Sequence, residues 1–354
     1  MAASEVNYHD YLQLDKILHA QFPESINRGS PAHDETLFII IHQAYELWFK
    51  LLHHEVDAVA ESLRQPSLND NSPALQIVVH RLNRVITTLR VLVHQIDIME
   101  TMNPMDFLDF RDMLRPASGF QSWQFKELEA KLGLKFGHRH GQEYYTAQLR
   151  PEHVAVIKAA ENNKSLLELV GEWLDRMPFF EEEQNWKNFV TSYSPAETAS
   201  VNIPVHVFWK EYQYRFVNSL ADAEKNNAGL FAELFLKGEK HENSILSPAA
   251  SRSALFIMLY RGYPILQLPY QLLNCLLEID EQLSNWRYRH MNMVHRIIGT
   301  RIGTGGSTGK DYLKAAADKH YIFKEIAQLT SFLIERRRLP ALSREMETRL
   351  GFRA

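Results

Sequence analysis

A histidine interrupts an otherwise apolar helical stripe in the last third of the chain. From Leu272 to Ile297 apolar residues recur in steps of four and three, and His290 stands where this spacing calls for a hydrophobic side chain. Removing an imidazole from water costs free energy unless both ring nitrogens find partners. A hydrogen bond and one axial bond to haem iron would satisfy them. A core histidine bonded to a backbone carbonyl is the structural alternative, and the spacing leaves both open.

A second histidine, His42, raises the same question on another apolar helical face, between Phe38 and Tyr45. In a dry pocket it could hydrogen-bond a substrate N–H group or a bound oxygen molecule, and its alternative is again a satisfied core residue. His53 and Glu55 in "HHEVD" lie two residues apart and point in different directions on a helix, so we predict a solvated face there.

The glycine-rich loop "GTGGSTGK" resembles a phosphate-binding loop but does not match one. That motif needs glycine where Thr304 stands and a hydroxyl where Asp311 stands, and it follows a strand. Exposed N–H groups, hydroxyls and a helix start after about Thr308 suit a carboxylate or an ammonium-bearing ligand, whereas a plain helix connection is the alternative. Arg111 in "FRDMLRPASG" carries the side chain best shaped to bind a carboxylate, although most arginines are solvated.

The elements that must position these residues are helices, because nearly every long segment has a helical apolar period. We predict an all-α, single large helical domain over 1–354, and the family resemblance described below implies that it surrounds a haem pocket. Long helices are expected over about 34–64, from about 73 to just before Asn103, and over 253–338 with interruptions. Residues 137–252 are less regular and are expected to form a variable helical insertion. The charged C-terminal tail is expected to be loosely held.

The composition favours small-molecule chemistry. The 354 residues are 45% hydrophobic and carry a formal net charge of -4, which offers no field for gathering nucleic acid. The only cysteine, Cys275, excludes an internal disulfide, and the richest apolar stretch is broken by glycine, proline and arginine. We expect a cytoplasmic protein without nucleic-acid or membrane partners.

Taken together, these segments resemble the tryptophan 2,3-dioxygenase family. The resemblance is carried by "YHDYLQLDKIL", "HDETLFIIIHQAYELWFK", "FRDMLRPASGFQSWQF", "LQLPYQLL" and "WRYRHMNMVHRIIGTRIGTGGSTGKDYL", which extend along most of the chain. The length and the C-terminal "FLIERRRLPAL" are more similar to the longer, animal-type members. The resemblance implies an enzyme that opens the indole ring of L-tryptophan with O₂ to give N-formylkynurenine, the first step of the kynurenine pathway.

The resemblance also implies roles for individual residues. His290 would be the axial ligand of ferrous haem b, and His42 would be the catalytic distal histidine that meets the indole N–H. Arg111 would bind the substrate carboxylate, and Thr304 its ammonium or carboxylate group. Further implied substrate contacts are Ser118, which would also lie near the haem, Phe38, and three residues of a neighbouring subunit's N-terminal arm (residues 1–30), Tyr8, Tyr11 and Leu12.

The implied assembly is a homo-oligomer, expected to be a homotetramer built as a dimer of dimers. Two other functions stay open at this stage. One is a related haem enzyme that inserts a single oxygen atom into an indole or phenol, and the other is a haem sensor without turnover. An amino-acid clamp made of Arg111 and Thr304 argues against the sensor.

Overall fold

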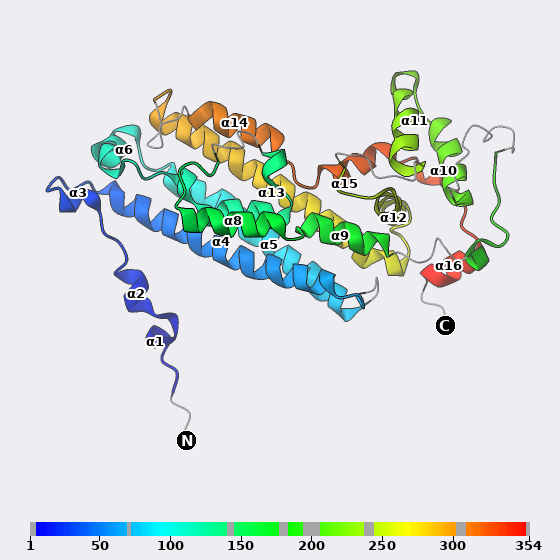
Figure 1. The fold of residues 1–354 in the computed structure, drawn as a ribbon, viewed down its shortest axis with the longest axis horizontal. Helices are drawn as coiled ribbons and strands as arrows, with labels where there is room; N and C mark the ends of the chain where they lie inside the picture. The colour runs from blue at the N-terminus through cyan, green and yellow to red at the C-terminus, as the bar shows by residue number, and fades with distance from the viewer. Residues whose placement is uncertain are drawn as a thin grey trace.

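The computed structural model describes residues 5–68, 72–139, 145–176, 183–193, 206–236, 244–301 and 309–351. Within these ranges the chain forms helices and connecting segments and no strands, which confirms the all-α prediction (Figure 1). In the same ranges, no helix combines the length and the hydropathy that crossing a bilayer requires.

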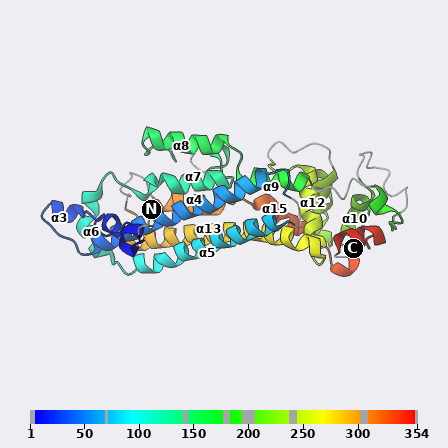
Figure 2. The same ribbon diagram turned by 90° about the horizontal axis from the view of Figure 1, so that it is seen from below.

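Three long helices form the centre of the molecule: α4 (Asp34–Arg64), α5 (Pro73–Met99) and α13 (Gln267–Ile298). They run side by side along the longest axis in both ribbon views (Figures 1 and 2). Each buries an apolar stripe against the others, as the sequence period requires. Helix α5 begins sharply, because the Ser72 side chain accepts from the Leu75 N–H and Pro73 occupies the first turn. Helix α4 confirms the predicted boundaries, α5 begins as predicted but ends earlier, at Met99, and α13 lies within the longer span predicted over 253–338.

A second layer covers α4 and holds much of the region predicted to be less regular. Helices α7 (Trp123–Leu132), α8 (Pro151–Asn162) and α9 (Leu166–Asp175) lie over α4, with α8 outermost (Figure 2). Ser165 and Glu168 form a reciprocal cap at the start of α9, whose apolar residues join the main core cluster. The assignment of 137–252 to an insertion stays a prediction.

The end of the molecule opposite the N-terminal helices is held by aromatic contacts. It contains α10 (Val207–Val217), α11 (Asn226–Phe231), a π-turn (Ala232–Leu236), α12 (Pro248–Leu259), α15 (Lys324–Gln328) and α16 (Arg344–Leu350) (Figure 1). The remaining short 3-10 segments are Asp112–Leu114, Gly119–Gln121, Phe136–His138, Glu183–Trp186, Asp222–Glu224, Pro264–Leu266, Leu329–Phe332 and Arg336–Arg338.

Two sequence-based expectations are wrong. The C-terminal tail is not loosely held, because Met346 and Leu350 on α16 are fully buried in the main core cluster. The "HHEVD" segment is not a solvated face, because His53 and Glu55 are both buried. His53 Nε2 donates to the Gln124 carbonyl oxygen at 2.9 Å, and Glu55 pairs with Arg84 at 2.6 Å. Partners on α7 and α5, which local periodicity cannot reveal, make this burial possible.

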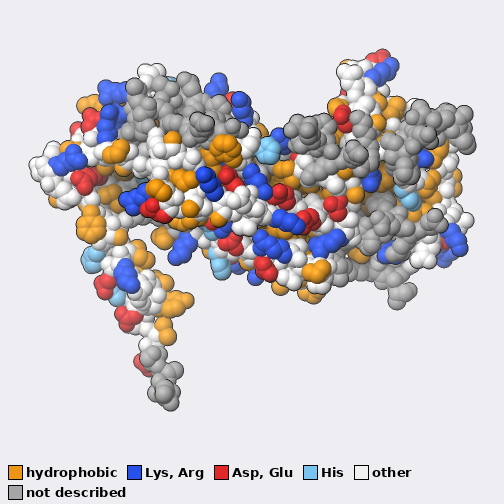
Figure 3. Space-filling model, in the orientation of Figure 1, with side chains coloured by type: hydrophobic (Ala, Val, Ile, Leu, Met, Phe, Trp, Pro, Cys, Tyr) orange, Lys and Arg blue, Asp and Glu red, His pale blue; other side chains and the backbone are white. Residues whose placement is uncertain are grey.

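The N-terminal arm extends away from the helical body. It contains α1 (Tyr8–Leu12), α2 (Leu14–Leu18) and α3 (Glu24–Asn27), and neither α1 nor α2 buries a residue (Figure 1). Apolar side chains stand along the arm in contact with solvent (Figure 3). Helix α3 is fixed to its own chain, because Ser25 is fully buried and its N–H donates to Glu35 at 2.9 Å. Helices α1 and α2 bury no residue, and helices this short are unstable alone in water, so this outer part of the arm needs a further surface to stabilise it.

Candidate functional site

A large pocket lies near the C-terminal end of α13. It is enclosed by α4, α5, α6 (Pro104–Arg111), α13, α14 (Gly309–Lys319) and the segment from Ser118 to Glu129, and its empty volume is about 1380 Å³ including the open mouth. The pocket brings together residues from four separate sequence motifs, namely Phe38, His42, Arg111, Ser118 and His290.

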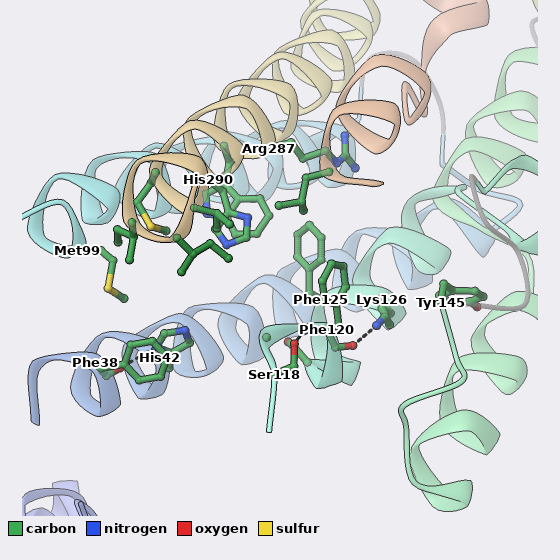
Figure 4. A pocket seen from close by; sticks show the side chains of 18 of the residues that line it. Phe38, His42, Met99, Ser118, Phe120, Phe125, Lys126, Tyr145, Arg287 and His290 are labelled. Carbon is green, nitrogen blue, oxygen red and sulfur yellow. Dashed lines mark hydrogen bonds between the residues drawn. The ribbon is translucent and has the colours of Figure 1, made fainter. Parts of the chain in front are cut away.

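His290 projects from α13 into the pocket (Figure 4). Its ring is parallel to the Trp286 ring one turn earlier, with centroids 5.1 Å apart. Its Nδ1 atom is buried and has no hydrogen-bond partner among the described residues. This nitrogen is therefore not bonded to a backbone carbonyl, as the structural alternative would require. Burial, assisted by the nearby His42, lowers the pKa of His290 to about 4. The ring is therefore neutral at pH 7 and keeps a lone pair for a metal.

His42 faces the same pocket from α4, one turn after Phe38. Its Nδ1 lies 2.7 Å from the Phe38 carbonyl oxygen. A carbonyl can only accept, so Nδ1 carries the proton and Nε2 of the neutral ring is left as an acceptor. The side chain is exposed at the pocket in the single chain, yet desolvation by the surrounding protein lowers its pKa, and this effect outweighs the opposing effects of the Phe38 carbonyl and Glu46. His42 can thus accept a hydrogen bond from a ligand N–H group.

Aromatic rings form the wall beside His42. The Phe38 ring centroid lies 4.1 Å from that of His42, 5.7 Å from Phe107 and 5.6 Å from Phe110. Phe107 and Phe110 belong to α6, which starts at Pro104 with Asn103 as its N-cap. The same helix ends at Arg111, which is only 4% exposed and lines the pocket. A guanidinium is therefore held at the apolar end of the pocket, where it can bind a carboxylate.

Ser118 lies on the floor of the pocket at the start of the 3-10 turn Gly119–Gln121 (Figure 4). Its hydroxyl oxygen accepts from the Phe120 N–H at 3.3 Å, and its own N–H donates to the Gln121 side chain at 3.4 Å. This reciprocal cap fixes the turn, so the Ser118 hydroxyl is held at the cavity surface.

A buried ionic cluster at the other end of the pocket was not predicted from the sequence. Glu129 Oε2 accepts from Arg139 Nη1 at 2.6 Å, and its Oε1 accepts from Arg287 Nη2 at 2.7 Å. Arg287 Nη1 also donates to the His320 carbonyl oxygen at 2.9 Å. Glu129 and Arg287 are 158 residues apart. The only local signal is a glutamate on the apolar face of α7, beside Leu128 and Leu132.

The other predicted site residues do not lie in this pocket among the described residues. Thr304 and the glycine loop fall outside the described part of the chain. Tyr8, Tyr11 and Leu12 are on the arm, where Tyr8 and Tyr11 are 74% and 75% exposed. Their predicted role toward a neighbouring subunit stays a prediction.

The pocket fits a flat, mostly apolar cofactor held through one imidazole. Within the described ranges, no three His, Cys, Asp or Glu side chains are grouped to chelate a metal ion, so His290 offers a single bond. Its neutral ring and the surrounding Met, Ile and Phe side chains suit a haem bound through this imidazole. His42, on α4, lines the same pocket as His290.

Comparison with known proteins shows which family this chain resembles. A family described as "Tryptophan 2,3-dioxygenase" matches residues 1–333. A protein of that name from Alteromonas mediterranea is 44% identical over 98% of this chain and 97% of its own length. One from Bdellovibrio bacteriovorus is 40% identical and covers 98% of both chains. One from Xenopus laevis is 39% identical over 95% of this chain and 84% of its own. A chain of this length therefore also has bacterial relatives.

The Glu129 cluster predicts a pH-dependent contribution to stability. Burial alone would raise the pKa of Glu129, but Arg139 and Arg287 outweigh it and hold the pKa at about 2, below the ordinary 4.5. The ionised carboxylate therefore stabilises the fold fully above pH 4.5, and this contribution is lost as the pH falls toward 2. We expect Glu129→Gln to lower the free energy of unfolding by roughly 3–5 kcal/mol at pH 7, because two buried guanidinium groups lose their counter-charge.

Urea unfolding of both proteins between pH 7 and pH 3 checks this. The difference between wild type and Glu129→Gln should shrink below about pH 4.5. Glu281→Gln, an exposed position on α13, is the control and should leave stability nearly unchanged. A difference that is constant down to pH 3 would show that the carboxylate charge does not supply the stability.

Proposed function

The chain belongs to the tryptophan 2,3-dioxygenase family. The protein is therefore an oxidoreductase that cleaves the C2–C3 bond of the indole ring of L-tryptophan with O₂, giving N-formylkynurenine. We propose how the residues of its pocket contribute to this reaction. The observation that carries the residue assignments is the convergence of Phe38, His42, Arg111, Ser118 and His290 on one pocket. We also propose that the enzyme is cytoplasmic.

We assign His290 as the residue that would hold the iron of haem b, in its ferrous form. The neutral, desolvated imidazole and its place on the wall of the pocket support this assignment. When bound, haem supplies the iron that activates dioxygen, and the protein supplies position and dryness. The parallel Trp286 ring limits rotation of the imidazole and so keeps it oriented toward the cavity.

The remaining residues orient the substrate. The Nε2 acceptor of His42 suits the indole N–H, and we assign it to orientation rather than to obligatory proton abstraction, because an indole N–H is a poor acid. Phe38 packs against the ring, Arg111 binds the carboxylate, and Ser118 lies near the haem and the indole. Thr304 would contact the ammonium or carboxylate group. A misplacement of about 1 Å can cost on the order of 10²-fold in rate, so these contacts matter for turnover.

We also propose that the active unit is an oligomer, a homotetramer arranged as a dimer of dimers. Its support is the arm, whose Tyr8, Tyr11 and Leu12 follow an i, i+3, i+4 spacing and are exposed in the single chain. Leaving such side chains in water forgoes the free energy of burying them. Docking over the pocket mouth of a neighbouring subunit would bury them and close the site.

Oxygen labelling tests the reaction type. The haem-loaded protein is reduced without air, given L-tryptophan and then ¹⁸O₂, and the product is weighed by mass spectrometry. Both labels should appear in the product. One label would support insertion of a single oxygen atom, and haem that binds O₂ without consuming tryptophan would support a sensor.

Arg111→Leu tests the carboxylate contact. It should weaken binding of tryptophan by several kcal/mol but leave binding of indole nearly unchanged, because only tryptophan carries the carboxylate that loses its partner. Calorimetric titration of both ligands measures the difference. Arg115→Leu is the matched control, because its side chain lies four residues away and is 53% exposed. Equal losses for tryptophan and indole would assign Arg111 a structural role.

Subunit mixing tests the arm. One subunit lacks residues 1–30 and keeps His290, and the other keeps the arm and carries His290→Ala, so each is inactive alone. After subunit exchange, activity should return, because a hybrid contains one haem site covered by the other chain's arm. As a control, intact wild-type subunits should recover activity after the same exchange procedure. If this control recovers activity and verified hybrids stay inactive, the arm covers the pocket of its own chain.

A further inference from the structure

Lys126 is a buried cation at the polar end of the pocket. It projects from α7, is 8% exposed and lines the same cavity as His290. Its ammonium group donates to the Phe120 carbonyl oxygen, as the dashed line in Figure 4 shows. An ammonium has three N–H donors, and no other hydrogen bond from Lys126 is formed within the described residues. None of the carboxylates described lies within ion-pair distance of it.

The neighbouring carboxylate, Glu129, is not a direct partner of Lys126. Its two oxygens accept from Arg139 and Arg287, at 2.6 and 2.7 Å, and neither lies within ion-pair distance of the Lys126 ammonium. Glu129 therefore acts on Lys126 only at longer range, and Arg139 opposes that attraction. Burial is the largest influence and lowers the pKa of Lys126 to about 8. A buried ammonium without a direct counter-charge is costly, and the cavity is the open side from which a counter-charge can come.

We propose that Lys126 binds a carboxylate of the cofactor that His290 holds. This rests on the proposed function, and the cofactor's chemistry suits it, because haem b carries two propionate carboxylates along one edge of an apolar macrocycle. Glu129 and its two arginines hold the surroundings of Lys126 rigid, since Arg139 Nη2 also donates to the Lys126 carbonyl oxygen at 2.9 Å. The lysine is thus a preformed anion contact at the polar end of the cavity.

The other carboxylate in the system, that of tryptophan, has a different partner. Arg111 ends α6, whose Phe107 and Phe110 contact Phe38 at the His42 end. Lys126 lies at the opposite end of the pocket, beyond Phe120 and Phe125 in the close-up view (Figure 4). A ligand that contacts both His290 and Lys126 must therefore extend along the cavity from α13 to α7, as we propose for the cofactor.

A chemical double-mutant cycle tests the proposal through cofactor binding. The apoprotein is loaded with haem b or with its dimethyl ester, which lacks both carboxylates, and dissociation is followed spectroscopically by transfer to a haem acceptor. Lys126→Met should speed the loss of haem b by about 10- to 100-fold and change the loss of the ester little. Lys126→Arg should restore haem b binding. Lys131→Met is the matched control, since Lys131 lies on the same helix, pairs with Asp57 and does not line the pocket.

Several outcomes would overturn the proposal. Equal losses of haem b and ester from Lys126→Met would show a structural role, and no change with either cofactor would show no contact. If circular dichroism shows that Lys126→Met does not fold, the wild type and Lys126→Arg still test the proposal. Both proteins must then hold haem b more tightly than its dimethyl ester. Weaker tryptophan binding with unchanged haem b binding would assign the lysine to the substrate. A wild type that binds neither cofactor would instead contradict the proposed function itself.

Discussion

The constraint on which the site depends is an imidazole held in an apolar helical stripe without a hydrogen bond to its buried nitrogen. Placing His290 there costs free energy that a leucine would not, and burial keeps the ring neutral. The rest of the pocket is arranged around this ring. Arg287, one turn earlier on α13, is fixed to Glu129 on α7, so the helix that carries the histidine and the helix that carries the pocket floor are joined by a buried ion pair.

Two ends of different character follow from this arrangement. At the apolar end, Phe38 and the α6 aromatics surround a histidine whose tautomer is set by a backbone carbonyl, so its outer nitrogen accepts rather than donates. At the polar end, a glutamate saturated by two arginines leaves one lysine facing the cavity. A flat cofactor with acidic groups on one edge and a small aromatic amino acid fit these two ends without competing for one cation.

The sequence was sufficient for the long helices, and the same local signal drew attention to the two histidines, although it left a structural role open for each. An apolar period of 3.6 defines α4 and α13, and a histidine within such a stripe is visible from its neighbours alone. The Glu129 cluster was not predictable, since its partners come from α7, the segment after it and α13, and charge pairing over that distance exists only in the folded chain. Burial of His53 and of the C-terminal helix depends in the same way on contacts from distant segments.

The most direct test of the central claim replaces the imidazole and then returns it from solution. His290→Gly removes the side chain and leaves a space that free imidazole can enter. Without imidazole, the variant should lose stoichiometric haem, and with imidazole it should regain it, with an iron–nitrogen vibration in the resonance Raman spectrum that shifts when deuterated imidazole is used. A variant that keeps full haem content and a histidine-type spectrum without imidazole would contradict the assignment of His290.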